Sequence, residues 1–230
     1  MIKALITLIS LLAILSAPGF SQQYQSQRND MVENQIRNRG IRHQPTLDAM
    51  RAVPRHIYVP SNVQRQAYND RPLPIGYGQT ISQPYIVGYM TEIIQPRENF
   101  SVLEIGTGSG YQAAVLAEIV DHVYTIEIVE ELGKRAQKIL EEHYDNVSVK
   151  IADGYYGWEE HAPFDAIVVT AAAEHIPPPL INQLKDGGKM IIPVGSPFRV
   201  QQLMLVEKTG DDITSRSLMP VRFVPFTSSD

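Results

Sequence analysis

The chain has 230 residues, of which 43% are hydrophobic and 20% are charged, a composition typical of one globular domain and unlike that of a disordered or fibrous protein. Its formal net charge of −5 argues against a protein that binds duplex nucleic acid by neutralising many phosphates. The absence of cysteine excludes a disulfide framework, a thiolate nucleophile and a zinc site built on cysteine.

The first residues have the pattern of a secretory leader. Lys3 precedes an apolar run over residues 4–17, and the small residues of "SAPG" follow at its end. The run is short for a bilayer span of ~20 residues, and a retained membrane anchor is the alternative. We expect a signal peptide over residues 1–21, cleaved near Ser21, and a single exported domain over residues 22–230 that resides in the bacterial periplasm.

Residues 22–100 are expected to form a helical extension on the substrate side of the domain. "RNDMVENQIRNRG" predicts an amphipathic helix closed by Gly40. "TLDAMRAV" predicts a second helix, with Thr46 at its N-cap and Pro54 beyond its end. Residues 55–84 lack regular periodicity and are rich in proline, tyrosine and glycine, which predicts loops that line a site.

Residues 101–230 have the pattern of a mostly parallel sheet. Short β-branched runs are separated by helical stretches, and they read "SVLEI", "HVYTIEI", "VSVKI", "FDAIVV" and "KMIIPV". Strands that alternate with helices favour right-handed parallel crossovers. The last two strand-like runs, within residues 201–226, are joined by a Gly-Asp turn, so we expect an antiparallel C-terminal edge whose strand order stays open. The predicted class is a doubly wound α/β fold.

A glycine-rich turn, "GTGSG", follows the first of these strands. Gly106, Gly108 and Gly110 allow positive φ and let a ligand approach the backbone closely. Their G-x-G-x-G spacing differs from the G-x-G-x-x-G of dinucleotide folds, and no P-loop G-K-[ST] follows. Glu104, two residues before the first glycine, would repel a pyrophosphate and suits a cation.

Two more acidic residues stand at the ends of the next strands. Glu127 lies about 20 positions beyond the glycine turn, where dinucleotide folds bind ribose hydroxyls. Asp153 follows the third strand and is placed to recognise an adenine amino group. Three such carboxylates suit a positively charged adenosine ligand, and S-adenosylmethionine fits that description. The alternative is that each residue is a turn former or a solvated strand end.

With these residues in view, the sequence strongly resembles the protein-L-isoaspartate (D-aspartate) O-methyltransferase family, over about residues 30–226. The resemblance rests on four stretches: "AYNDRPLPIGYGQTISQPYIVGYMTE", "VLEIGTGSGYQAAVLA", "PFDAIVVTAAAEHIPPPLINQLKDGGKMIIPVG" and "VRFVPF". The second occurs in many methyltransferases, whereas "GQTISQP" is a marker of this family. The resemblance implies the Rossmann-like fold of a class I methyltransferase that depends on S-adenosylmethionine.

The resemblance also implies an activity and a set of site residues. The activity is methylation of the free α-carboxylate of an L-isoaspartyl residue in a damaged protein or peptide, after which the ester collapses to a succinimide. Ser82 takes the active-site position. The cofactor-binding set joins the family positions to the glycine turn and the strand-end acids: Thr80, Ile81, Glu104, Gly106, Thr107, Gly108, Gly110, Glu127, Asp153, Gly154 and Thr227.

The implied reaction needs no strong general base. An α-carboxylate of this type has an ordinary pKa of about 3.5, so it is already an anionic nucleophile at neutral pH. The rate then depends on the alignment of the reactants and on the exclusion of water. The Ser82 hydroxyl can orient one carboxylate oxygen, and its alternative role is a helix cap before Pro84.

Two other functions stay open at this point. One is a different carboxyl or small-molecule methyltransferase, and the other is a non-catalytic adenosine-binding module. We expect isoaspartyl proteins or peptides as partners, no nucleic acid, no stable membrane partner once the leader is cleaved, and a monomer. None of the six histidines has the H-E-x-x-H spacing, so no metal is expected. Trp158 is expected to pack, with an adenine wall as the lesser alternative.

Overall fold

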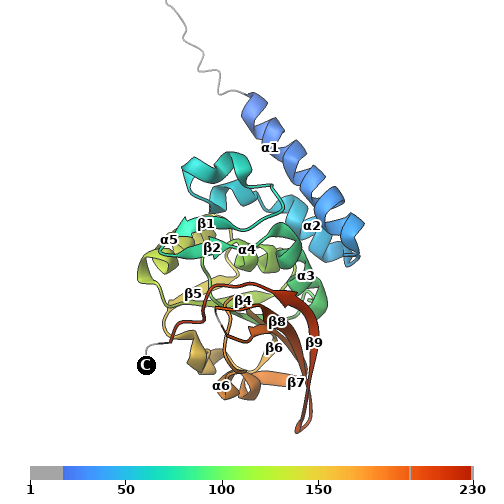
Figure 1. The fold of residues 1–230 in the computed structure, drawn as a ribbon, viewed down its shortest axis with the longest axis vertical. Helices are drawn as coiled ribbons and strands as arrows, with labels where there is room; N and C mark the ends of the chain where they lie inside the picture. The colour runs from blue at the N-terminus through green and yellow to red at the C-terminus, as the bar shows by residue number, and fades with distance from the viewer. Residues whose placement is uncertain (1–17, 197, 229–230) are drawn as a thin grey trace, which may run out of the picture.

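A seven-stranded sheet forms the centre of the computed structural model, which describes residues 18–196 and 198–228 (Figure 1). The predicted leader lies outside these residues, except for its last four, which begin helix α1 (Pro18–Asp30). The strand order is β5-β4-β3-β6-β7-β8-β9. In chain order the strands are β3 (Ser101–Ile105), β4 (His122–Glu127), β5 (Val147–Ile151), β6 (Phe164–Val169), β7 (Leu184–Val194), β8 (Gln201–Thr209) and β9 (Asp212–Val221).

The pairing confirms the mostly parallel sheet and its antiparallel C-terminal edge. Strands β3 to β7 run parallel to one another, whereas β8 pairs antiparallel with both β7 and β9. A tight turn at Gly210, whose φ is 59°, joins β8 to β9 and leaves no room for a helical crossover. The order that the sequence left open is therefore a meander with β9 outermost. Winding reverses beside β3, which is where doubly wound sheets bind ligands.

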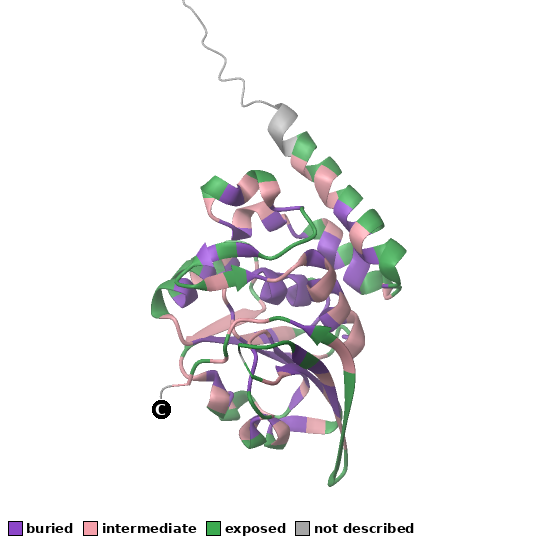
Figure 2. Ribbon diagram, in the orientation of Figure 1, coloured by how far each residue is buried: buried purple, intermediate pink, exposed green. Residues whose placement is uncertain are grey.

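The two faces of the sheet are covered unequally. Three helices, α3 (Pro84–Ile94), α4 (Tyr111–Ala117) and α5 (Glu130–Glu141), share one apolar core with alternate residues of the strands. The other face is covered by the short helix α6 (Pro178–Asn182) and by single helical turns. Because side chains alternate along a strand, Val102 belongs to the first core and its neighbour Leu103 to the second. The strands at the centre are buried accordingly (Figure 2).

The first helical stretch of the N-terminal extension begins with α1 and continues through a π-helical and a 3-10 turn. It ends at Gly40, whose φ of 108° is the predicted glycine cap. The next helix, α2, spans Gln44–Ala52 and stops before Pro54, as predicted. The N-cap assigned to Thr46 is wrong. The N-cap is His43, three residues earlier, because Pro45 fits the first turn of the helix. The Thr46 hydroxyl instead lies 2.8 Å from the ring Nδ1 of His43.

A separate two-stranded hairpin, β1 (Leu73–Gly76) and β2 (Gln79–Ile81), lies near α4 and α5 (Figure 1). Its tip is Tyr77, a non-glycine residue with a φ of 53° between two glycines of positive φ. Arg135 of α5 donates to the Ile75 carbonyl at 2.8 Å. The hairpin is thereby held next to the strand ends, and it carries the "GQTIS" stretch toward the sheet.

Candidate active site

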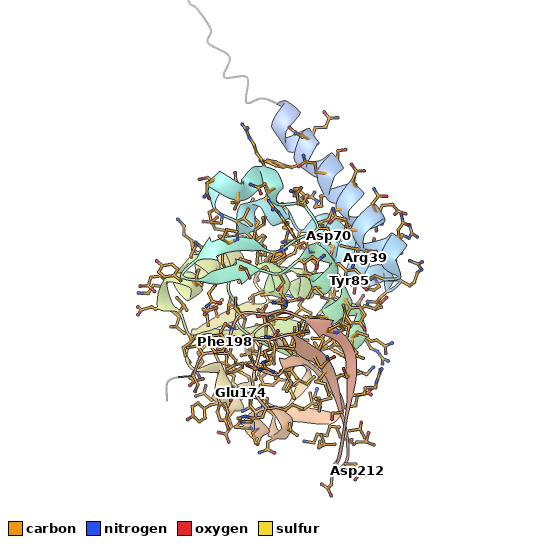
Figure 3. The ribbon with its side chains drawn as sticks, viewed as in Figure 1. Arg39, Asp70, Tyr85, Glu174, Phe198 and Asp212 are labelled. Atoms are coloured by element: carbon orange, nitrogen blue, oxygen red, sulfur yellow. The ribbon has the colours of Figure 1, made fainter. Side chains whose placement is uncertain are left out.

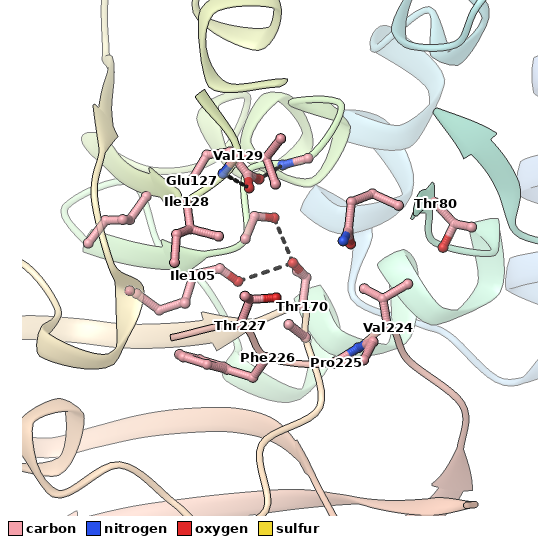
Figure 4. Close-up of a pocket in the computed structure, with 16 residues that line it drawn as sticks. Thr80, Ile105, Glu127, Ile128, Val129, Thr170, Val224, Pro225, Phe226 and Thr227 are labelled. Carbon is pink, nitrogen blue, oxygen red and sulfur yellow. Dashed lines mark hydrogen bonds between the residues drawn. The ribbon is translucent and has the colours of Figure 1, made fainter. Parts of the chain in front are cut away.

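Three adjoining pockets lie at the carboxyl ends of the central strands. The strand-end pocket, with about 550 Å³ of empty space, is lined by the ends of β3, β4 and β6 and by residues 224–227 (Figure 4). The inner pocket, about 310 Å³, lies between residues 80–82 and the glycine turn. The outer groove, about 970 Å³, lies between residues 82–86 and residues 219–224. Thr80 and Thr170 line all three, so the pockets meet at these two residues.

The glycine turn brings its backbone to the pockets as expected. Gly106 and Gly108 have φ values of 93° and 54° and line both the strand-end and inner pockets. A Cβ on Gly106 would lie 2.5 Å from the Thr170 hydroxyl oxygen, so no larger residue fits there without displacing Thr170. Gly110 plays a different part, because a Cβ there would lie 3.2 Å from Leu140 of α5, and it therefore allows close helix packing.

Glu127 is buried at the end of β4 with its carboxylate fixed in place. Its two oxygens accept backbone hydrogen bonds, one from Gly108 at 2.7 Å and one from Val129 at 2.9 Å (Figure 4). Each carboxylate oxygen has a second lone pair. The residue lines the strand-end pocket, so an acceptor suited to a pair of ribose hydroxyls stands at its wall.

Glu104 lines the inner pocket and is fully buried. One of its oxygens accepts a hydrogen bond from the Thr125 hydroxyl, which lies 2.6 Å from the Thr107 hydroxyl. The other oxygen has no hydrogen-bond partner among the described residues. Burial raises the pKa of Glu104 to about 8. A buried acceptor left unpaired costs about 1–3 kcal/mol, so this carboxyl is matched to a donor that the protein itself does not provide.

The residues after β5 are only partly in the pocket. Gly154 lines it, and a Cβ there would lie 2.4 Å from Ile105, so glycine is required for the turn to close over β3. Asp153 is not among the lining residues; its carboxylate accepts from the Tyr155 backbone at 2.8 Å and from the Ser228 hydroxyl at 2.7 Å. Thr227 does line the pocket.

Ser82 lies at the boundary between the inner pocket and the outer groove. It is not the cap of α3, because that helix begins at Pro84 and Gln83 occupies the N-cap position. The Ser82 hydroxyl makes no hydrogen bond to any residue that the structure describes, whereas its carbonyl accepts from the Arg55 guanidinium at 2.7 Å. The hydroxyl is therefore available to a ligand, and the predicted trio of Thr80, Ile81 and Ser82 does share the inner pocket.

Two parts of the site were missed by the sequence reasoning. Thr170, just after β6, donates to the Gly106 carbonyl at 2.6 Å and stands where the pockets meet (Figure 4). Residues 224–226 reach the pocket because Ala172 exchanges backbone bonds with Val224 and Phe226, each 2.8 Å long. Thr170 follows a strand next to the winding reversal, a signal that could have identified it. In the C-terminal segment the resemblance pointed to Thr227 alone, and the place of residues 224–226 depends on pairing with Ala172.

Trp158 packs rather than walling the pocket. Its ring meets Tyr124 edge-on, with centroids 5.5 Å apart, and lies near His161. In the part of the chain that the structure describes, no three histidine or acidic side chains gather as a metal site would require. Over the same residues, no helix has both the length and the apolar character needed to cross a bilayer.

A sheet wound in this way, with an acid before the G-x-G-x-G turn and another beyond it, has the Rossmann-like arrangement expected of a class I methyltransferase that uses S-adenosylmethionine as its methyl donor. The family model described as protein-L-isoaspartate(D-aspartate) O-methyltransferase matches residues 26–230. The chain belongs to this family. The resemblance, the fold class, the enzyme class and the cofactor expected from the sequence are thereby confirmed.

Individual relatives agree. A protein-L-isoaspartate O-methyltransferase of Opitutus terrae is 54% identical over 98% of this chain and 98% of its own length. Protein-L-isoaspartate O-methyltransferase 2 of Polaromonas sp. is 60% identical over 80% of this chain and 90% of its own. Among solved structures, the chain is similar to a Plasmodium falciparum protein described as a protein-L-isoaspartate O-methyltransferase, in complex with S-adenosyl-L-homocysteine. The TM-score is 0.76 at 25% identity, and the match covers 87% of this chain and 98% of that one.

Proposed function

We propose that this enzyme methylates the free α-carboxylate of L-isoaspartyl residues in damaged proteins or peptides and so starts their repair through a succinimide. The observation that carries the proposal is the meeting of three pockets at Thr80 and Thr170, with the Ser82 hydroxyl free beside them. Two reactants can approach that point from different sides. One comes along the strand ends and the other along the outer groove.

The cofactor-binding residues divide between the two ends of the donor. Glu127 accepts the ribose hydroxyls in the strand-end pocket, and Gly154 and Thr227 flank the adenine. Asp153 holds the turn that carries Gly154, through its bonds to Tyr155 and Ser228. Glu104 receives the cationic methionine end in the inner pocket. S-adenosylmethionine supplies an electrophilic methyl group when bound there.

The protein's task is then to orient the acceptor and keep water away. The outer groove holds the peptide, and the Ser82 hydroxyl donates to one oxygen of the isoaspartyl α-carboxylate while the other faces the methyl group. That carboxylate is ionised at neutral pH, so the chain needs to remove no proton from it. Thr80 and Ile81 close the inner pocket above the glycine turn.

The test is methyl transfer from labelled S-adenosylmethionine to a synthetic isoaspartyl peptide and to its ordinary aspartyl isomer. The proposal predicts labelling of the first only. A hydrogen bond to a charged group is worth about 1.5–3 kcal/mol, so Ser82→Ala should lower kcat/KM about 10-fold to 100-fold. Ser217→Ala, on the exposed part of β9, is the control and should match the wild type. Equal labelling of both isomers would indicate a different carboxyl methyltransferase, and binding without transfer a non-catalytic module.

We also propose that residues 1–21 direct export and that residues 22–230 act as one monomeric domain, with residues 22–100 on the substrate side and 101–230 around the cofactor. The charged, apolar and small-residue regions at the start of the chain support this. Fractionation of cells that express the tagged full chain, with mass spectrometry of its N-terminus, tests it. A processed protein in the periplasmic fraction is expected; an intact N-terminus in the cytoplasmic fraction would contradict export.

A further inference from the structure

Arg55, on the helical turn Arg55–Tyr58, is the only lysine or arginine that is fully buried in the part of the chain that the structure describes. No carboxylate of the described residues lies within ion-pair distance of it. Burial lowers the pKa of Arg55 to about 10, which still leaves the guanidinium charged at neutral pH. Burying a cation without a counter-ion is unfavourable, so a buried arginine of this kind calls for a role that its hydrogen bonds supply.

The contacts of Arg55 join two segments to the active site. Its Nε donates to the Ala67 carbonyl and its Nη2 to the Ser82 carbonyl, each at 2.7 Å. Its guanidinium carbon lies 4.8 Å from the ring centre of Tyr111, which lines the inner pocket. The third nitrogen, Nη1, has no hydrogen-bond partner among the described residues. One planar side chain therefore spans the loop at Ala67, the wall at Ser82 and a tyrosine of the inner pocket.

The planar guanidinium of Arg55 makes the link between these two carbonyls rigid. Arginine presents donors in a fixed plane, so two bonds from one guanidinium fix the separation of the two carbonyls, whereas a lysine ammonium is a point donor on a flexible stem. Ser82 directly follows β2, and Gln83 separates it from α3, so neither element's own backbone bonds hold its carbonyl. The hydrogen bond from Arg55 holds the Ser82 carbonyl instead.

We propose that Arg55 is a positioning residue that fixes the Ser82 backbone, and with it the hydroxyl that orients the acceptor carboxylate. This inference rests on the proposed function of Ser82. The hydroxyl contributes to peptide binding before and during methyl transfer, so loss of its placement raises KM more than it lowers kcat. The donor is held by other residues, Glu127 and Glu104 among them, so its binding is spared.

The experiment compares Arg55→Met, Arg55→Lys and the matched control Arg65→Met, an exposed arginine of the same segment. Steady-state methyl transfer gives KM and kcat for an isoaspartyl peptide, and calorimetry gives the Kd of S-adenosylhomocysteine. We expect Arg55→Met to raise KM at least tenfold with kcat and Kd within threefold of the wild type. Arg55→Lys should recover part of the loss, and Arg65→Met should change nothing.

A double-mutant cycle separates positioning from a general structural role. In a Ser82→Ala background there is no hydroxyl to place, so Arg55→Lys or Arg55→Met should change KM less than threefold. An undiminished KM effect in that background, or a loss of S-adenosylhomocysteine affinity that matches the loss of peptide affinity, would overturn the proposal. Should Arg55→Met fail to fold, the cycle with Arg55→Lys distinguishes the same two outcomes. A wild-type protein that leaves the isoaspartyl peptide unlabelled contradicts the proposed function instead.

Discussion

The environment of Glu104 suits a bound ligand but is unfavourable for the ligand-free protein. It is fully buried, it has one oxygen without a partner among the described residues, and burial holds its pKa near 8. At neutral pH the ligand-free enzyme therefore keeps this carboxyl mostly protonated. A cation in the inner pocket favours the ionised form, so donor binding releases a proton.

The raised pKa predicts how stability varies with pH. Between the ordinary pKa of a glutamate and a value of about 8, the folded protein holds a proton that the unfolded chain has lost, so the free energy of unfolding falls as pH rises through this range. The full effect is ~3–5 kcal/mol. Urea unfolding of the ligand-free protein from pH 5.5 to 8.5 should show this slope, and Glu104→Gln should flatten it. The exposed control Glu98→Gln should keep it. Parallel curves for the wild type and Glu104→Gln would contradict the assignment.

A second prediction concerns Gly106. Alanine at positive φ costs about 1–2 kcal/mol at any site. Gly106→Ala adds a clash, since the new Cβ would lie 2.5 Å from the Thr170 hydroxyl, whereas Gly187→Ala has a similar φ of 75° and meets nothing within 4 Å. Both variants should lose stability in urea unfolding, and only Gly106→Ala should also lose at least tenfold in S-adenosylhomocysteine affinity by calorimetry. Equal affinities in the two variants would show that the clash is relieved without disturbing the pocket.

The sequence could predict the site residues whose role follows from their local sequence pattern. Gly106 and Glu127 sit at strand ends whose chemistry is readable from spacing, and the structure brings both to the strand-end pocket. Thr170 and Phe226 were not predicted, because each enters the site through a contact between distant segments. Arg55 was missed for a related reason: arginine is rarely buried, so nothing in its local sequence indicated that it would reach Ser82.

At the scale of elements, the β1–β2 hairpin is the part of the site that is least stable by itself. It is two short strands, and an isolated hairpin is only marginally stable in water. Leu73, Ile75 and Ile81 pack it into the first core, and Arg135 of α5 adds a polar anchor through its bond to the Ile75 carbonyl. The placement of residues 79–82 therefore depends in part on a helix that follows them by some 50 residues.

Removal of this anchor should loosen the hairpin while the sheet stays intact. Arg135→Met deletes the 2.8 Å bond, and Lys134→Met, its exposed neighbour, is the control. Hydrogen exchange measured by mass spectrometry should speed up about tenfold over residues 73–82 in Arg135→Met only, since one charge-assisted bond is worth about 1.5 kcal/mol or more. We also expect a higher KM for the peptide. Unchanged exchange in this segment would show that the hairpin is held by other contacts.

The elements themselves were mostly predictable, and their ends were not. Five parallel strands and the two helices between the first three follow from apolar runs and periodicity alone. Thr46 and Ser82 were each taken as candidate helix caps, and in both cases the helix begins elsewhere because a proline fits its first turn. The N-terminal helix also starts well before the predicted stretch. The order of β8 and β9 was left open because both runs have a strand-like pattern, and only the pairing shows that the mostly exposed β9 takes the edge.

At the scale of the whole molecule, the outer groove has a charge that differs in sign from the chain's net charge of −5. Two arginines, Arg39 and Arg222, line it, and none of the described residues that line it is acidic. Arg39 is paired with Asp70 at 2.7 Å and lies over the Tyr85 ring at 3.6 Å, a cluster visible in Figure 3. Arg222 has no ion pair with any described residue, so it contributes the groove's unbalanced positive charge.

This charge predicts a preference among damaged sequences. At low salt, an isoaspartyl peptide with a neighbouring glutamate should have a KM about 3-fold to 10-fold below that of the same peptide with lysine, and the difference should shrink at 0.5 M salt. Arg222→Gln should reduce the preference, whereas Arg216→Gln, on the exposed stretch of β9 beyond the groove, should leave it. A preference for the lysine peptide, or an unchanged preference in Arg222→Gln, would show that other groups determine the electrostatic potential of the outer groove.

Methyl transfer by the proposed route depends on where the methyl donor lies, and a crystal structure with S-adenosylhomocysteine tests that directly. It should show the ribose hydroxyls on the Glu127 carboxylate, the amino group toward Glu104, and the sulfur where the three pockets meet, near Thr80, Thr170 and Ser82. A ligand bound outside the strand-end pocket, or bound there with its sulfur directed away from Ser82, would contradict this route.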